Sequence, residues 1–214
     1  MRSLSVRTEF VVVVALAFGL PIYASLIVIT SSGSPVLFSD QALWTTVVYE
    51  TIVAAALAVF LKSGWTAQDI GLAPSFKDTA VGVPLLVGAY GAYFILWCAF
   101  IAVTGGIEAP EISARDLTVS AVLIASCVNG LFEEVFVCGY VITAVKLRRS
   151  ATFAVNVSLA IRATYHLYQG AVGVLSIVPM GLIFGHWFAR TGRLWPLVVA
   201  HVLADIIGFM YYVN

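Results

Sequence analysis

The chain has 214 residues, of which 61% are hydrophobic and 10% are charged, with 11 basic and 11 acidic side chains. A soluble globular domain has roughly 45–50% apolar and about 25% charged residues, so this chain has too little charge to cover a water-facing surface. Composition and a mean hydropathy of +1.02 exclude a soluble enzyme, a disordered chain and a basic nucleic-acid binder. They indicate an all-α, polytopic transmembrane bundle.

A helix needs about 20 apolar residues to cross a bilayer, and seven stretches meet this requirement. In chain order they are residues 10–31, 42–61, 79–104, 117–145, 151–169, 171–189 and 194–213. The first stretch is longer than the apolar region of a secretory signal, and no A-x-A-like site follows it, so we expect an uncleaved first helix. With no repeat and no linker, residues 1–214 are predicted to form a single integral-membrane domain.

The polar connector between the second and third stretches, residues 62–78, has its own apolar pattern. It carries Trp65, Ile70 and Leu72 at near-helical spacing. This spacing predicts a short helix lying on the membrane surface, in addition to the seven spans.

The distribution of Lys and Arg predicts the orientation, because these residues accumulate on the cytoplasmic side. With the N-terminus inside, only Arg115 falls in an outer segment. The nine inner residues are Arg2, Arg7, Lys62, Lys77, Lys146, Arg148, Arg149, Arg190 and Arg193. We therefore expect a plasma-membrane protein with its N-terminus inside and its C-terminus outside.

Six ionisable residues fall deep within the predicted spans. They are Glu133, Glu134, Arg162, His166, His201 and Asp205. A charged group at mid-membrane costs at least about 2.5–3.5 kcal/mol, so the default interpretation of such residues is a functional site. Two further residues, Glu50 in the second span and His186 near the inner boundary, are interpreted as structural.

The spacing of these residues predicts convergence. Arg162 and His166 are four residues apart, as are His201 and Asp205, so each pair shares one helix face. Together with Glu133 they give three helices a polar stripe each. Because unpaired polar groups in hydrocarbon are too costly, we expect all three stripes to face one water-filled cavity.

Two kinds of chemistry fit this set. A carboxylate and a neutral imidazole can take a proton from water, while a second histidine, oriented by a carboxylate, stabilises an oxyanion. Alternatively, Glu133, His166 and His201 can hold a divalent metal such as zinc. The H-E-x-x-H motif is absent, and both alternatives remain open at this point.

Three segments resemble the motifs of the CAAX protease and bacteriocin-processing family of intramembrane proteases. Residues 132–139, FEEVFVCG, resemble the first motif, E-E-x-x-x-R. Residues 162–170, RATYHLYQG, resemble the second, F-x-x-x-H, and residues 201–205, HVLAD, match the third, H-x-x-x-N/D. The resemblance extends over roughly residues 60–210, which would form the catalytic core.

The resemblance implies an intramembrane endopeptidase that cuts a membrane-embedded or membrane-anchored peptide or protein. By carry-over, Glu133 and His166 activate water, His201 and Asp205 stabilise the oxyanion, and Glu134 holds the geometry and charge balance of the site. The family is described both as metalloproteases and as metal-free glutamate proteases, so the cofactor is unknown and zinc remains an option. The implied partners are this substrate and the lipid bilayer, with no nucleic acid.

Two positions depart from the family pattern. Cys138 replaces the arginine of the first motif, and Arg162 replaces the phenylalanine of the second. Since two adjacent glutamates need a nearby cation, we expect the Arg162 guanidinium to form a bidentate pair with Glu134 or Glu133.

Three alternatives to a glutamate peptidase follow from the sequence. The loss of the arginine favours a non-catalytic relative that binds a membrane peptide, such as a bacteriocin-immunity or chaperone-like protein. A proton-coupled transporter would carry an inverted repeat, which this sequence lacks. A nucleophilic Cys138 would require thiolate formation.

Overall fold

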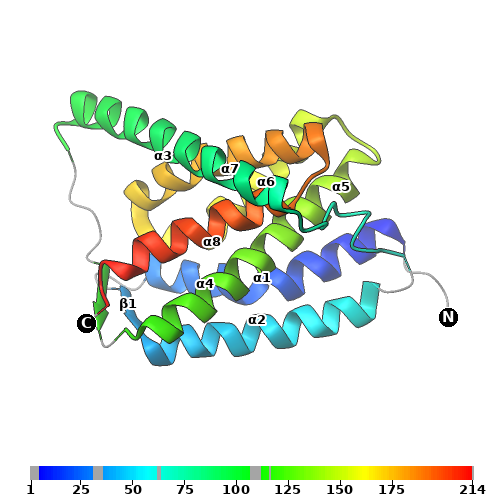
Figure 1. The fold of residues 1–214 in the computed structure, drawn as a ribbon, viewed down its shortest axis with the longest axis horizontal. Coiled ribbons are helices and arrows are strands. Elements are labelled where there is room, and N and C mark those ends of the chain that lie inside the picture. Colours follow the sequence, from blue (N-terminus) through cyan, green and yellow to red (C-terminus); the bar gives the residue numbers. More distant parts are fainter. Residues whose placement is uncertain (1–4, 31–35, 62–63, 107–111, 116, 214) are drawn as a thin grey trace.

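The computed structural model describes residues 5–30, 36–61, 64–106, 112–115 and 117–213, and these form a helical bundle (Figure 1). The predicted all-α class is confirmed. The helices are α1 (Val6–Thr30), α2 (Asp40–Leu61), α3 (Phe76–Thr104), α4 (Val119–Glu133), α5 (Val141–Lys146), α6 (Ala151–Tyr165), α7 (Gly170–Thr191) and α8 (Trp195–Met210).

Two short non-α segments interrupt the second half of the chain. A π-helical segment, η1 (Glu134–Tyr140), joins α4 to α5 without a break, so that the three form one rod. A 3₁₀ turn, η2 (Leu167–Gln169), joins α6 to α7. Both interruptions directly follow residues that the sequence singles out, since η1 begins after Glu133 and η2 begins after His166.

The predicted spans differ in length. Within the described residues, five helical segments are long and apolar enough to cross a membrane, and α4–η1–α5 is the most buried of them. The other two helices, α6 with 15 residues and α8 with 16, measure about 22–24 Å at 1.5 Å per residue, which is shorter than a hydrocarbon core of about 30 Å. Both pack against longer helical segments: α6 contacts α1, α7 and the α5 part of the α4–η1–α5 rod, and α8 contacts α3 and the α4 part of this rod.

Two short strands, which the sequence analysis did not predict, lie at one end of the bundle. β1 (Val36–Ser39) and β2 (Ile112–Arg115) pair in parallel, with Val36 opposite Ile112. At the same end, Leu117 forms a β-bridge with Val213, the residue that follows the last turn after α8. These pairings connect the segments before α2, before α4 and after α8 across that end (Figure 1).

The predicted surface helix in the connector between α2 and α3 is wrong over its described part, residues 64–75. Residues 67–71 form successive turns instead. Gly71 adopts a φ of 67°, which ends any helix there, and its carbonyl accepts a hydrogen bond of 2.9 Å from the backbone N–H of Leu194. The apolar spacing arises because Ile70 and Leu72 pack against the core of the bundle, not because a helix lies on the membrane.

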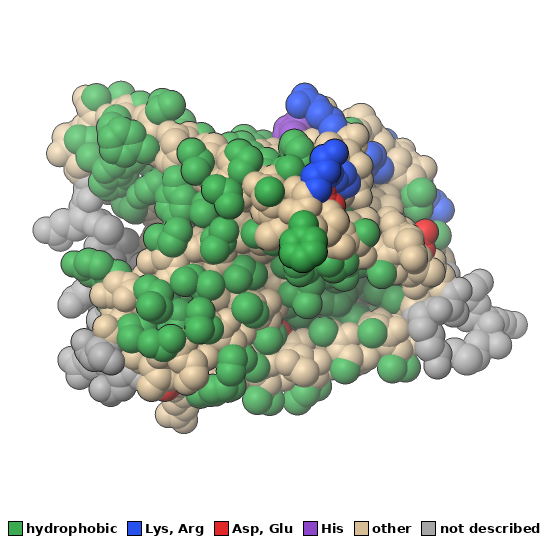
Figure 2. All heavy atoms as spheres, in the orientation of Figure 1, with side chains coloured by type: hydrophobic (Ala, Val, Ile, Leu, Met, Phe, Trp, Pro, Cys, Tyr) green, Lys and Arg blue, Asp and Glu red, His purple; other side chains and the backbone are tan. Residues whose placement is uncertain are grey.

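Basic side chains gather at the end of the molecule opposite to the strands. Figure 2 shows Lys and Arg clustered on one side of an otherwise apolar surface. Arg2 and Lys62 lie outside the described residues, but the other seven inner residues lie where α1 and α3 begin or where α5 and α7 end. Arg115 belongs to β2, at the opposite end.

This polarity predicts the orientation of the protein. A tag placed before α1 should be accessible from the cytoplasm, and a tag placed after Val213 should be accessible only from the opposite side, because basic ends stay inside. Protease accessibility in sealed vesicles of both orientations measures this. Two tags exposed on the same side would contradict the seven-span arrangement.

Candidate active site

The two adjacent glutamates occupy the junction between α4 and η1. Glu133 is the last residue of α4 and is 7% exposed, whereas Glu134 is the first residue of η1 and is fully buried. Adjacent side chains on a regular α-helix diverge by about 100°. Segments of π-helix occur frequently at functional sites, where they re-aim side chains. Here the two carboxylates approach one and the same cation.

That cation is Arg162 on α6, as the sequence predicts. Its Nη2 lies 2.6 Å from Glu134 Oε1, and its Nη1 lies 3.6 Å from Glu133 Oε2. The expected bidentate pair is wrong, because the fork of the guanidinium is divided between the two glutamates. The side chain is completely buried, and its Nη2 also lies 3.8 Å from the Sγ of Cys138. Arg162 therefore supplies its charge next to the position where the family motif has an arginine.

His201 on α8 contacts the same oxygen of Glu134 as Arg162 does. Its Nδ1 lies 2.7 Å from Glu134 Oε1, so Nδ1 carries the hydrogen and donates it. Its Nε2 lies 3.7 Å from Asp205 Oδ1 and 4.0 Å from Glu133 Oε2. Asn129 on α4 donates from Nδ2 to Asp205 Oδ2 at 3.0 Å, which holds this carboxylate beside the ring.

His166 lies directly after the end of α6. Its Nδ1 lies 2.9 Å from the carbonyl oxygen of Arg162. Because a carbonyl can only accept, Nδ1 carries the hydrogen and Nε2 keeps its lone pair free. The turn that follows is held by Ser25 on α1, whose buried Oγ accepts a hydrogen bond of 2.8 Å from the backbone N–H of Tyr168.

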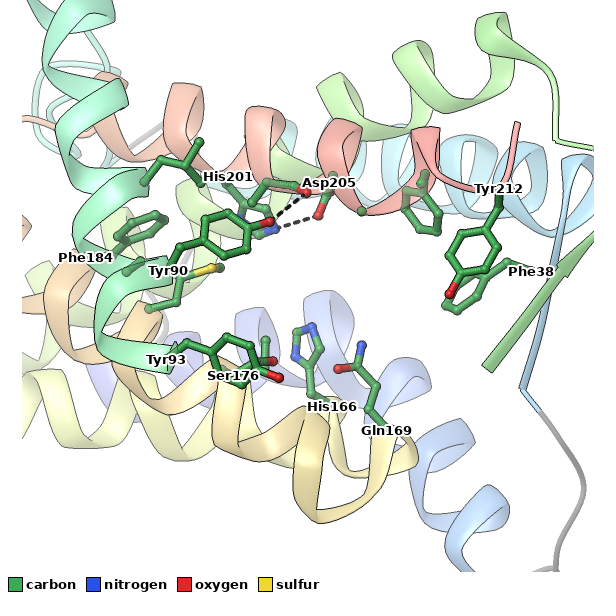
Figure 3. A pocket seen from close by; sticks show the side chains of 17 residues that line it. Phe38, Tyr90, Tyr93, His166, Gln169, Ser176, Phe184, His201, Asp205 and Tyr212 are labelled. Atoms are coloured by element: carbon green, nitrogen blue, oxygen red, sulfur yellow. Dashed lines mark hydrogen bonds and ion pairs between the residues drawn. The ribbon is translucent and has the colours of Figure 1, made fainter. Parts of the chain in front are cut away.

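Two cavities meet at His166. A cavity of about 410 Å³ is lined by His166, His201 and Asp205, and Figure 3 shows His166 facing the other two from the opposite wall. A second cavity of about 400 Å³ is lined by Glu133 and His166, with Asn129 among its other residues. The expectation of a single cavity is therefore corrected: His166 lines both spaces, and Glu133 and His201 face different ones.

The alternative of a metal bound by Glu133, His166 and His201 does not fit this arrangement. Among the described residues, no group of three His, Cys, Asp or Glu side chains is placed to hold a metal ion. Glu133 and His201 also line different cavities. The description of this chain as a metalloprotease is therefore not supported.

Sequence reasoning missed three polar neighbours of the site. The Tyr165 hydroxyl donates to Glu133 Oε2 at 2.5 Å, and Asn129 bonds Asp205 as described above. Glu50, interpreted from the sequence as structural, is buried and lines the same cavity as Glu133. Asn129 was recognisable, since it precedes Glu133 by four residues and so shares its helix face. Glu50 was recognisable as an ionisable group within an apolar run, whereas nothing local indicated Tyr165.

The hydrogen bond from Tyr165 leads to a prediction. Tyr165→Phe should slow peptide cleavage about 10- to 100-fold while the protein stays folded, because a hydrogen bond to a charged group contributes about 1.5–3 kcal/mol. Initial rates of cleavage measure this. Tyr140→Phe is the matched control, since the Tyr140 hydroxyl donates to Glu9 at 3.0 Å, away from both cavities. Equal effects of the two substitutions would contradict a role for Tyr165 in the site.

The fold and the site together define an integral membrane protein with acid–base groups buried on three helices. Residues 115–207, less than half of the chain, match the model of the family described as type II CAAX prenyl endopeptidase Rce1-like. This segment contains all three motifs, and the match confirms the resemblance to the CAAX protease family. No curated protein and no solved structure matches the chain significantly. The matched family is one of proteases, which supports a peptidase.

Proposed function

We propose that the protein is an intramembrane endopeptidase that hydrolyses a peptide bond of a membrane-associated substrate with water activated by Glu133 and His166. One observation carries this proposal. Glu133 and His166, whose Nε2 keeps its lone pair free, line one cavity, while the fully buried Glu134 and Arg162 form an ion pair next to Glu133. The site therefore combines two hydrogen-bond acceptors that line a cavity with a buried, charge-balanced ion pair.

The water would be activated by two acceptors. The Glu133 carboxylate and the unprotonated Nε2 of His166 both accept hydrogen bonds, so a water between them can direct a lone pair at a carbonyl carbon. As the water oxygen bonds to that carbon, its proton passes to Glu133. Tyr165 and the Nη1 of Arg162 hold the ionised form of Glu133 in place beforehand.

His201 and Asp205 would stabilise the oxyanion. Nδ1 of His201 donates to Glu134, and the two further carboxylates near Nε2 favour the doubly protonated imidazolium. His201 lines the other cavity, but its Nε2 lies 4.0 Å from Glu133 Oε2 and His166 lines both spaces. A carbonyl placed at this junction would receive the Nε2–H hydrogen bond as negative charge develops on its oxygen. Asp205, held by Asn129, orients the ring.

A non-catalytic relative that binds a membrane peptide is the second candidate. The observation in its favour is Cys138, which stands where the family motif has an arginine. Against it, the Arg162 guanidinium occupies the space beside Cys138 and contacts Glu134. The charge balance that the family pattern requires is thus present, although its cation comes from another helix.

The test is incubation of the detergent-purified protein with a library of membrane-anchored peptides, with products mapped by mass spectrometry and metal content assayed in parallel. Wild type should cleave at defined bonds, and His166→Ala should lose activity. His186→Ala is the matched control, because His186 also places Nδ1 2.9 Å from the carbonyl four residues earlier. Binding of peptides without cleavage would favour the non-catalytic candidate.

A further inference from the structure

Glu50 is a buried acid that takes no part in the proposed activation of water or in the stabilisation of the oxyanion. It lies on α2, is 5% exposed, and its Oε2 has no hydrogen-bond partner. Within the part of the chain that the structure describes, no ion pair connects it to a basic side chain. A polar group buried without a partner costs free energy of folding. We therefore infer that this carboxyl group, which lines a cavity, has a functional role.

The position of Glu50 joins two spaces. It lines the cavity of about 400 Å³ together with Glu133, Asn129 and His166. It also lines an apolar cavity of about 590 Å³ between α2, the α4–η1 rod and the connector, which includes Trp65. Glu50 therefore stands where a chain entering from the apolar side would meet the acid–base groups.

Glu50 and Glu133 differ in what surrounds them. Glu133 lies 3.6 Å from a guanidinium nitrogen and accepts a short hydrogen bond from Tyr165, both of which stabilise a carboxylate. Glu50 has neither, and burial without a cation favours the neutral acid. Two carboxyl groups that face one cavity in opposite protonation states are the arrangement of a general base and a general acid.

We propose that Glu50 is the general acid that protonates the leaving amine, an inference that rests on the proposed function. Water bonds to the carbonyl carbon, and its proton passes to Glu133. The C–N bond then breaks as its electron pair takes the proton of the Glu50 carboxylic acid. The products are a carboxylic acid and an amine, leaving Glu133 protonated and Glu50 ionised. A water in the shared cavity returns the proton from Glu133 to Glu50.

The test compares two leaving groups on one acyl segment. Once a cleaved peptide is known, an activated aryl ester of the same segment is prepared, whose phenolate leaves without a proton. Glu50→Gln should lower peptide cleavage about 10²- to 10⁴-fold but lower ester cleavage little. Glu9→Gln is the matched control, since Glu9 accepts hydrogen bonds from Trp65 and Tyr140 and lines neither site cavity.

An infrared measurement tests the protonation state of Glu50 independently of turnover. Wild-type protein should show an infrared carbonyl band of a protonated carboxylic acid that Glu50→Gln removes and Glu9→Gln retains. Equal loss of peptide and ester cleavage, or no loss of the infrared band, would overturn the assignment. Undiminished peptide cleavage by Glu50→Gln would contradict the acid role alone, whereas a wild type that cleaves no peptide of the library would contradict the proposed function and the acid role with it.

Discussion

Glu133→Gln should lower peptide cleavage about 10²- to 10⁴-fold, the usual loss when an acid–base group is removed, and leave the protein folded. A carboxamide cannot take the proton from water. It still offers an oxygen that accepts the hydrogen bond of Tyr165, which in the wild type spans 2.5 Å. The measurement is single-turnover cleavage of an identified peptide, with thermal unfolding in the same detergent.

Substitution of the adjacent glutamate, Glu134, should lower the stability of the folded protein, which Glu133→Gln should leave unchanged. Glu134 is fully buried and contacts both Arg162 and His201. Glu134→Gln removes the charge that neutralises Arg162, and breaking a buried ion pair costs about 3–5 kcal/mol of unfolding free energy. Glu134→Gln should therefore lower the melting temperature markedly, while Glu133→Gln should not. If both variants were equally destabilised, or if Glu133→Gln kept its rate, the division of roles between the two residues would be wrong.

Arg162→Ala should destabilise the protein by about 3–5 kcal/mol and also inactivate it. The substitution leaves Glu134 buried without its cation, and it removes the positive charge that lies 3.6 Å from Glu133. Unfolding in detergent measures the first effect and peptide cleavage measures the second. Cys138→Ser serves as the control, because Cys138 contributes no charge to the pair, and we expect little change from it.

A double substitution tests whether the two positions exchange the cation. The Sγ of Cys138 lies 3.8 Å from Arg162 Nη2, so an arginine introduced at position 138 would carry its charge toward the same carboxylate. Cys138→Arg combined with Arg162→Phe restores the family pattern and should recover part of the stability and activity that Arg162→Phe alone loses. A double variant no better than Arg162→Phe would contradict the exchange.

The architecture was predictable from the sequence because it follows from local properties. Backbone groups in a bilayer must bond within their own segment, so apolar runs of sufficient length become helices wherever they occur. The seven predicted stretches each contain a helix for this reason. Rare charges within apolar runs also identified the residues of the site, since a charge inside a membrane is costly wherever it occurs in the chain. The predicted pairing of Arg162 followed from the need of two adjacent glutamates for one cation.

What only the tertiary structure decided depends on contacts between residues distant in the chain. The packing of α4, α6 and α8 determines three features of the site. These are the π-helical segment after Glu133, the contacts of the Arg162 guanidinium with both glutamates, and the presence of two cavities instead of one. Tyr165, which donates a hydrogen bond to Glu133, lies 32 positions from it in the sequence. Glu50, which lines the same cavity as Glu133, lies 83 positions from it. The connector shows the same limit: its apolar residues are spaced as in a helix, but the described residues 67–71 form turns, and the positive φ of Gly71 and its backbone contact to Leu194 do not fit a helix. A periodic pattern records which residues are buried, whereas packing determines what they are buried against.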